Sequence, residues 1–259
     1  MLLAPSKSGA SALRLPAARD FPPVDEHLVQ PETTRDELIR GRRVMAMPAL
    51  PPHADRHFKL DYVIGAYVKE GYVGATELLT RPAQASDFAT DTCIRREGVD
   101  PATGSRHLEE LAFEVVSEQS MRDITEKAED LTSRGVRRVV AIFVKKGEAC
   151  EWKSGAWKKL EPEAMFSDPT LARPLRVRAL LDAAEADNAV ASALLAKGNP
   201  VLMKLSAQGE AKGLRAAVRS LCRVLSITLT AEREDALEGM TAAELDALRE
   251  RIERDRRWD

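Results

Sequence analysis

The chain has 259 residues, of which 44% are apolar and 31% are charged, and its formal net charge is −2. This balance is typical of a soluble globular protein that is long enough to bury a core, and a charge so close to zero neither predicts nor excludes a nucleic-acid partner. No apolar run reaches the roughly 20 residues of a membrane span, and the N-terminal stretch lacks the continuous apolar region of a secretion signal.

The first part of the chain gives two predictions. Residues 1–30 are rich in Ala, Ser and Pro without periodicity, which predicts a disordered leader. The next segment is open to two interpretations. Thr34 and Glu37 have the spacing of a capping box before a helix that stops at Gly41, but Glu37-Leu-Ile and Arg43-Val-Met could equally be two short strands around the Arg40-Gly41 turn. The local pattern does not choose between them.

The middle of the chain predicts an α/β fold with a mixed sheet flanked by helices. Apolar residues at helical spacing predict helices over residues 54–69 and 121–134. Short runs of strand character lie at residues 72–79, 87–94, 108–116, 137–144 and 149–153. A helix, several strands, a second helix and further strands are typical of such a sheet. Trp152 and Trp157 flank a turn at Gly155, which predicts cross-strand packing between the two rings.

The last third of the chain predicts a small helical appendage. Residues 161–174 are irregular and contain proline, so we expect an α/β domain over residues 31–165 and helices over residues 170–259. Thr241 and Glu244 form a capping box before an apolar stripe. Alternating charges near the end are typical of a solvated or partner-binding helix.

Glu114 and Lys127 are the first candidates for chemistry. Strand alternation places Glu114 on a face that is otherwise apolar, where a carboxylate is costly unless it is paired or bound to a metal. Lys127 lies on the flank of the buried stripe of the following helix and can reach back over the strand. The plain alternatives are an ion pair of Glu114 with Arg122 and a surface pair of Lys127 with Asp123, four residues earlier.

Two upstream acids complete a set that could handle phosphate chemistry. Asp87 begins a predicted strand, and Glu37 begins the ambiguous segment. Carboxylates on neighbouring strands hold a hard divalent cation, and a lysine within reach can orient or deprotonate a water and stabilise charge at phosphorus. Asp91 competes with Asp87, since alternation points both side chains to the same face.

A family resemblance connects these residues. Phe113-Glu-Val-Val-Ser117, Arg122-Asp-Ile-Thr-Glu-Lys127 and the following Gly135-Val136 strand resemble the core of the Uma-two family of predicted restriction endonucleases, in the PD-(D/E)XK nuclease superfamily. Arg35 to Gly41, His57 and Ser86-Asp87 match further motifs in the same order, so the resemblance covers residues 31–160. Each motif is short, and the ordered set carries the resemblance. It favours the hairpin interpretation of the Glu37 segment and implies a restriction-endonuclease-like core.

The resemblance implies a site and an activity. Glu37, Asp87 and Glu114 would be metal ligands, and Asp87, Glu114 and Lys127 would be the catalytic residues. The cofactor would be Mg²⁺ or Mn²⁺. The enzyme would hydrolyse phosphodiester bonds in nucleic acid, above all in DNA. Two departures stand out: Ser86 replaces the proline of the family motif, and Val116 occupies the usual position of the superfamily's lysine, which Lys127 would replace from the helix. Asp91 would then be an outer group.

Several other assignments follow from the residue pattern. His53 and His57 have a metal-pair spacing, but no third ligand downstream supports a zinc site. No histidine near Ser117 in sequence supports acyl transfer. Three dispersed cysteines fit a reducing cytoplasm, and a homodimer is left open. Between Arg134 and Lys159 there are eight basic residues and two acidic ones. This excess of positive charge predicts either a stripe that faces phosphate groups or a solvated face of a hairpin.

The main alternative to an endonuclease is a catalytically inactive nuclease fold that acts in binding or assembly, with the C-terminal helices as its contact surface. Metal binding discriminates between the two. A purely helical structural protein is disfavoured by the strand content.

Overall fold

The computed structural model describes residues 21–29, 36–45 and 50–258. The chain divides into two compact units, Met1–Val190 and Ala191–Asp259. The sequence predicted a division between residues 165 and 170, so the two divisions differ in the segment up to residue 190. Of the predicted leader, residues 1–20 and 30 lie outside the described part, whereas residues 21–29 are placed and Val24 is buried.

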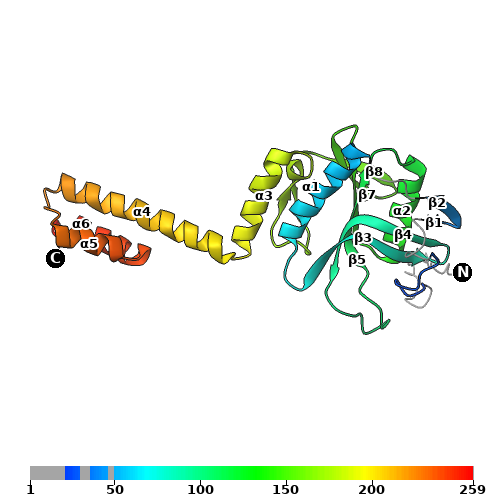
Figure 1. Cartoon of the computed structure of the whole chain (residues 1–259), viewed down its shortest axis with the longest axis horizontal. Helices are drawn as coiled ribbons and strands as arrows, with labels where there is room; N and C mark the ends of the chain where they lie inside the picture. Colours follow the sequence, from blue (N-terminus) through cyan, green and yellow to red (C-terminus); the bar gives the residue numbers. More distant parts are fainter. Residues whose placement is uncertain (1–20, 30–35, 46–49, 259) are drawn as a thin grey trace, which may run out of the picture. The chain divides into compact units, whose positions relative to one another are not determined.

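One mixed sheet organises the first unit (Figure 1). Among the described residues it has eight strands in the order β2-β1-β4-β5-β6-β7-β8, with β3 paired to β4. Within the described sheet, only β5 and β6 pair in parallel, because the helix between them carries the chain back across the sheet. The predicted α/β core with a mixed sheet flanked by helices is therefore confirmed. The strands are β1 (Asp36–Ile39), β2 (Arg42–Met45), β3 (Tyr72–Ala83), β4 (Ser86–Arg96), β5 (Glu109–Val116), β6 (Arg138–Phe143), β7 (Glu148–Lys153) and β8 (Ala156–Leu160).

Two hairpins match the local sequence. β1 and β2 pair antiparallel around Arg40 and Gly41, which both adopt positive φ (51° and 77°), as a two-residue turn requires. This settles the ambiguous segment as two strands. Trp152 of β7 pairs with Trp157 of β8, with ring centroids 5.2 Å apart, which confirms the predicted cross-strand packing.

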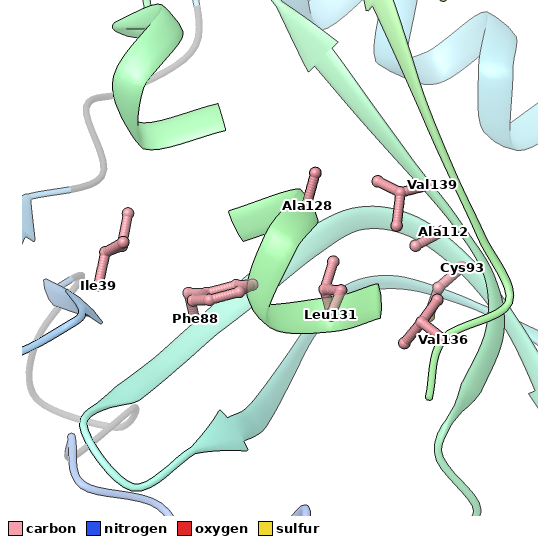
Figure 2. Close-up of a cluster of buried hydrophobic side chains, with 8 residues drawn as sticks. All are labelled: Ile39, Phe88, Cys93, Ala112, Ala128, Leu131, Val136 and Val139. Atoms are coloured by element: carbon pink, nitrogen blue, oxygen red, sulfur yellow. The ribbon is translucent and has the colours of Figure 1, made fainter. Parts of the chain in front are cut away.

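Two helices cover opposite faces of the sheet. α1 (Pro51–Tyr67) begins with prolines in its first turn, and α2 (Met121–Arg134) begins at the capping side chain of Ser120. The Thr92 hydroxyl of β4 donates a hydrogen bond to Asp61 of α1, whereas the side chain of the next residue, Cys93, packs with α2. Successive strand residues face opposite sides, so the two helices flank the sheet (Figure 1). Figure 2 shows the cluster beneath α2, which comprises Ile39, Phe88, Cys93, Ala112, Ala128, Leu131, Val136 and Val139.

β4 changes partner along one of its edges. β3 pairs with β4 over nearly its whole length, from Tyr72↔Arg96 to Ala83↔Ser86, so β1 and β5 must share the other edge. β1 reaches β4 only at Leu38↔Asp87, and β5 begins at Thr92↔Phe113. Between them, residues 88–91 have no strand partner on that side within the described sheet. We call this stretch the open edge of β4.

The rest of the chain is short strands and helices. After β8 come β9 (Met165–Phe166), β10 (Leu175–Arg176), the 3₁₀ turn η2 (Val177–Leu180) and the helices α3 (Ala183–Ala196), α4 (Pro200–Val224), α5 (Ala231–Gly239) and α6 (Ala242–Asp255). The second unit has its own core, which includes Val218, Cys222, Leu245 and Ile252. The predicted capping box at Thr241 and Glu244 is present. Among the described helices, none is both long and apolar enough to cross a membrane.

Candidate metal and catalytic site

At the open edge of β4, side chains make the hydrogen bonds that a neighbouring strand would otherwise make. The Ala89 N–H donates to Glu37 Oε1 at 3.0 Å, and the Ala89 carbonyl accepts from Lys127 Nζ at 3.2 Å. The Asp91 carbonyl lies 2.8 Å from His57 Nε2. Buried backbone groups need partners, so the missing strand is replaced by polar residues from β1, α1 and α2. Glu37, Lys127 and His57 therefore lie close together at this edge, because within the described sheet β4 has no partner strand here.

Lys127 points into the protein. Its side chain is 10% exposed, and Nζ lies 2.8 Å from Glu37 Oε2. The alternative, a surface pair with Asp123, does not form, since Asp123 pairs with Arg42. Burial alone would lower the pKa of Lys127, but the carboxylates of Glu114, Glu37 and Asp91 raise it above its ordinary value. The amine is therefore protonated near neutral pH.

Glu114 is the least satisfied member of the cluster. Only 3% of the residue is exposed, and Oε1 has no hydrogen-bond partner among the described residues. Burial raises the pKa of this carboxyl well above 4.5; Lys127 opposes the rise, and Asp91 and Glu37 add to it. Arg122 is not its partner, because Arg122 binds Glu126. A buried carboxylate oxygen without a partner is costly, and a cation would satisfy it.

Asp91 lies where the pairing of β4 with β5 stops. Its Oδ2 accepts from the Val115 N–H at 2.6 Å, next to Glu114 in the sequence. It also contributes to the pKa shifts of both Glu114 and Lys127. The family resemblance implied an outer role for Asp91, whereas its contacts place it within the cluster.

Asp87 has different surroundings. Its fully buried carboxylate accepts hydrogen bonds from His27 Nδ1 (3.0 Å) and from the backbone N–H groups of Leu28 (2.5 Å) and Val29 (3.2 Å). Asp91 lies four positions further along the strand, a span of about 13 Å. No hydrogen bond or ion pair among the described residues joins the Asp87 carboxylate to Glu114 or Lys127; it binds the segment before β1 instead. The hydroxyl of the preceding residue, Ser86, donates a hydrogen bond to Asp130 Oδ2 at 2.5 Å and accepts one from the Arg40 N–H at 3.0 Å.

The donor set at the open edge suits a hard divalent cation. The carboxylates of Glu37, Asp91 and Glu114 surround one ammonium group, that of Lys127. If all three acids are ionised, the negative charges exceed the positive one, and a dication would balance them. Oxygen ligands of this kind are what Mg²⁺ and Mn²⁺ prefer. The unpartnered Oε1 of Glu114 is the specific observation that fits such an ion.

Most of the basic residues between Arg134 and Lys159 have acidic or backbone partners. Arg137 and Arg138 bind Asp168 and Glu151, and Lys159 binds Glu148. These contacts favour the interpretation of a solvated, ion-paired hairpin over a free phosphate-facing stripe.

The fold of this chain has a neighbour among solved structures. No family model matches the chain, and no curated protein matches it. The chain is similar to a crystal structure from Anabaena variabilis ATCC 29413, described as a putative nuclease belonging to DUF820. The two share 15% identity with a TM-score of 0.48, over 56% of this chain and 89% of the other. The resemblance to the Uma-two family stays a prediction.

Proposed function

We propose that the first unit is a metal-dependent endonuclease that hydrolyses phosphodiester bonds in nucleic acid, with DNA as its substrate and Mg²⁺ as its cofactor, replaceable by Mn²⁺. One observation carries the proposal: three acids and one lysine converge at the open edge of β4, and a buried oxygen of Glu114 lacks a partner among the described residues. Such a set, on strands that separate from each other, can hold a cation beside a phosphate.

The proposed roles follow from the contacts. Asp91 and Glu114 would hold the ion, with Glu37 as a further ligand, and the bound ion would supply Lewis-acid stabilisation and an activated water. Lys127, buried beside Glu37, acts as a cation that donates hydrogen bonds and stabilises negative charge on the phosphate. In this proposal Asp91 takes the ligand position that the sequence assigned to Asp87.

Nicking of supercoiled plasmid by the full chain tests the proposal. With Mg²⁺ the wild type should nick, and Glu114→Gln and Lys127→Met should each lose about 100-fold or more of the rate. Glu148→Gln is the matched control, since Glu148 pairs with Lys159 on the β7–β8 hairpin and takes no part in the cluster. Its rate should equal that of the wild type.

Equal rates in wild type, Glu114→Gln and Lys127→Met would refute the assignment. A wild type that neither nicks DNA nor binds Mg²⁺ or Mn²⁺ in calorimetry would instead support the inactive binding or assembly module, in which the Lys127–Glu37 pair is purely structural.

A further inference from the structure

Two histidines and one acid meet on the α1 side of the open edge. One ligand atom from each of His53, His57 and Asp91 lies within 4.8 Å of the others. We propose that these three residues form a second cation site, selective for a first-row transition-metal dication. It shares Asp91 with the proposed Mg²⁺ site but is otherwise separate.

The fold builds this cluster from two elements. His53 and His57 lie one helical turn apart on α1, so both rings face the same side, with centroids 6.0 Å apart. Arg56 fixes the helix between them by donating to the Leu181 carbonyl at 2.6 Å. Asp91 comes from β4. The third ligand thus comes from a strand far along the chain, which explains why the spacing of the two histidines alone did not favour a metal site.

Hydrogen bonds hold the two rings in place. With a proton on Nε2, His57 donates to the Asp91 carbonyl at 2.8 Å and keeps a lone pair on Nδ1. His53 is buried, and its Nδ1 lies 3.4 Å from Ser117 Oγ. Metal-binding histidines characteristically have such a second partner that orients the ring. Asp61, bound by Thr92 at 2.6 Å, lies 3.6 Å from His57 Nε2.

The ligand chemistry determines which ion fits. Mg²⁺ prefers oxygen ligands, whereas neutral imidazole suits later first-row dications such as Co²⁺ and Zn²⁺ better. Two imidazoles and one carboxylate leave coordination positions open for water or substrate, as in catalytic metal sites. We therefore expect the His53–His57–Asp91 site to take Co²⁺ in preference to Mg²⁺.

Titration of the metal-free full chain with Co²⁺, followed by visible absorption, tests this site without reference to nuclease activity. Wild type should bind Co²⁺, and His53→Ala and His57→Ala should each weaken that binding by about 10- to 100-fold or more. Mg²⁺ affinity, measured by calorimetry, should stay within about threefold of wild type in both variants. His107→Ala is the matched control, because His107 lies outside the cluster, and it should bind Co²⁺ as the wild type does.

A second measurement on the unaltered protein guards against variants that fail to fold. On addition of Co²⁺, the ring protons of His53 and His57 should show paramagnetic shifts, while those of His107 should not. Wild type that binds no Co²⁺, or Co²⁺ affinity unchanged in both folded His variants, would overturn the inference. Because the readout is binding, this result is independent of whether the chain nicks DNA. Glu114→Gln should weaken Mg²⁺ binding and leave Co²⁺ at the histidines.

Discussion

At the scale of single residues, the cluster around Lys127 depends on one positive charge among several negative ones. Lys127 binds Glu37, and Glu114 and Asp91 also act on its amine. Removing one partner of a buried ion pair leaves an uncompensated charge, which costs far more than the pair itself contributes. Lys127 therefore stabilises the fold as well as serving the proposed chemistry.

The Lys127→Met variant should lower the free energy of unfolding by about 3–5 kcal/mol at neutral pH, because it removes the ion-pair partner of Glu37, whose side chain is only 14% exposed. Adding Glu37→Gln to the same chain should restore part of that loss. Urea denaturation at pH 7 measures both. Lys145→Met, which removes an exposed pair with Glu118, should cost no more than about 1 kcal/mol. A double variant that is no more stable than Lys127→Met would contradict this account.

Sequence patterns predicted some of these residues better than others. The pattern placed Glu114 on a buried face and Lys127 at the edge of the helix stripe, and both side chains point inward. It could not distinguish Asp87 from Asp91, because strand alternation treats residues four apart alike. The two residues differ in their neighbouring strands: Asp87 pairs with Leu38 of β1, whereas Asp91 lies just before the point where β5 begins to pair with β4. Which residues pair depends on long-range contacts between strands.

At the scale of elements, the irregular segment after β8 is attached to the sheet through Asp168. Its carboxylate accepts from Arg137 at 2.6 and 3.0 Å and from Thr170 Oγ1 at 2.7 Å. Burial raises the pKa of Asp168, but these bonds from Arg137 and Thr170 outweigh burial and hold it below its ordinary value. The ionised form is thus favoured in the folded chain.

Asp168→Asn should lower the free energy of unfolding by about 1.5–3 kcal/mol at pH 7, since it weakens charge-assisted hydrogen bonds. A carboxyl whose pKa is depressed on folding contributes stability above its unfolded pKa, near 3.8, and loses it as the pH falls. The difference between wild type and Asp168→Asn should therefore shrink below about pH 4 in denaturation series. A difference independent of pH would show that charge is not the cause.

Element boundaries were predictable where local chemistry marks them. α2 begins at the capping Ser120 and ends at Gly135, whose φ of 121° suits glycine, and its bounds match the predicted residues 121–134. β9 and β10 were not predicted, because two residues carry no periodicity. Residues 175–180 fall within the range 170–259 that was predicted to be helical, but they form β10 and the 3₁₀ turn η2 before α3 begins at Ala183.

At the scale of the whole molecule, each of the two compact units has its own core. Glu114 and Lys127 belong to the first, and the core of the second is built from α4, α5 and α6. Sequence periodicity predicted a helical C-terminal part and an α/β part before it. It could not place the division, since α3 runs from one unit into the other.

Leu245→Ala should destabilise the second unit by about 2–5 kcal/mol, because Leu245 is fully buried in that core. Hydrogen exchange followed by mass spectrometry should show faster exchange in α4 and α6, with β5 and β6 unchanged. Equal acceleration in β5 and β6 would show that the units unfold together.

The central claim is that the site lies at the open edge of β4, with Asp91 as its acid. The most direct measurement compares Mg²⁺-dependent plasmid nicking by Asp91→Asn and Asp87→Asn, with thermal melting of both variants as the folding control. We predict that Asp91→Asn loses about 100-fold or more of the rate and that folded Asp87→Asn stays within about threefold of the wild type. Loss of nicking in folded Asp87→Asn together with retention in Asp91→Asn would contradict the claim.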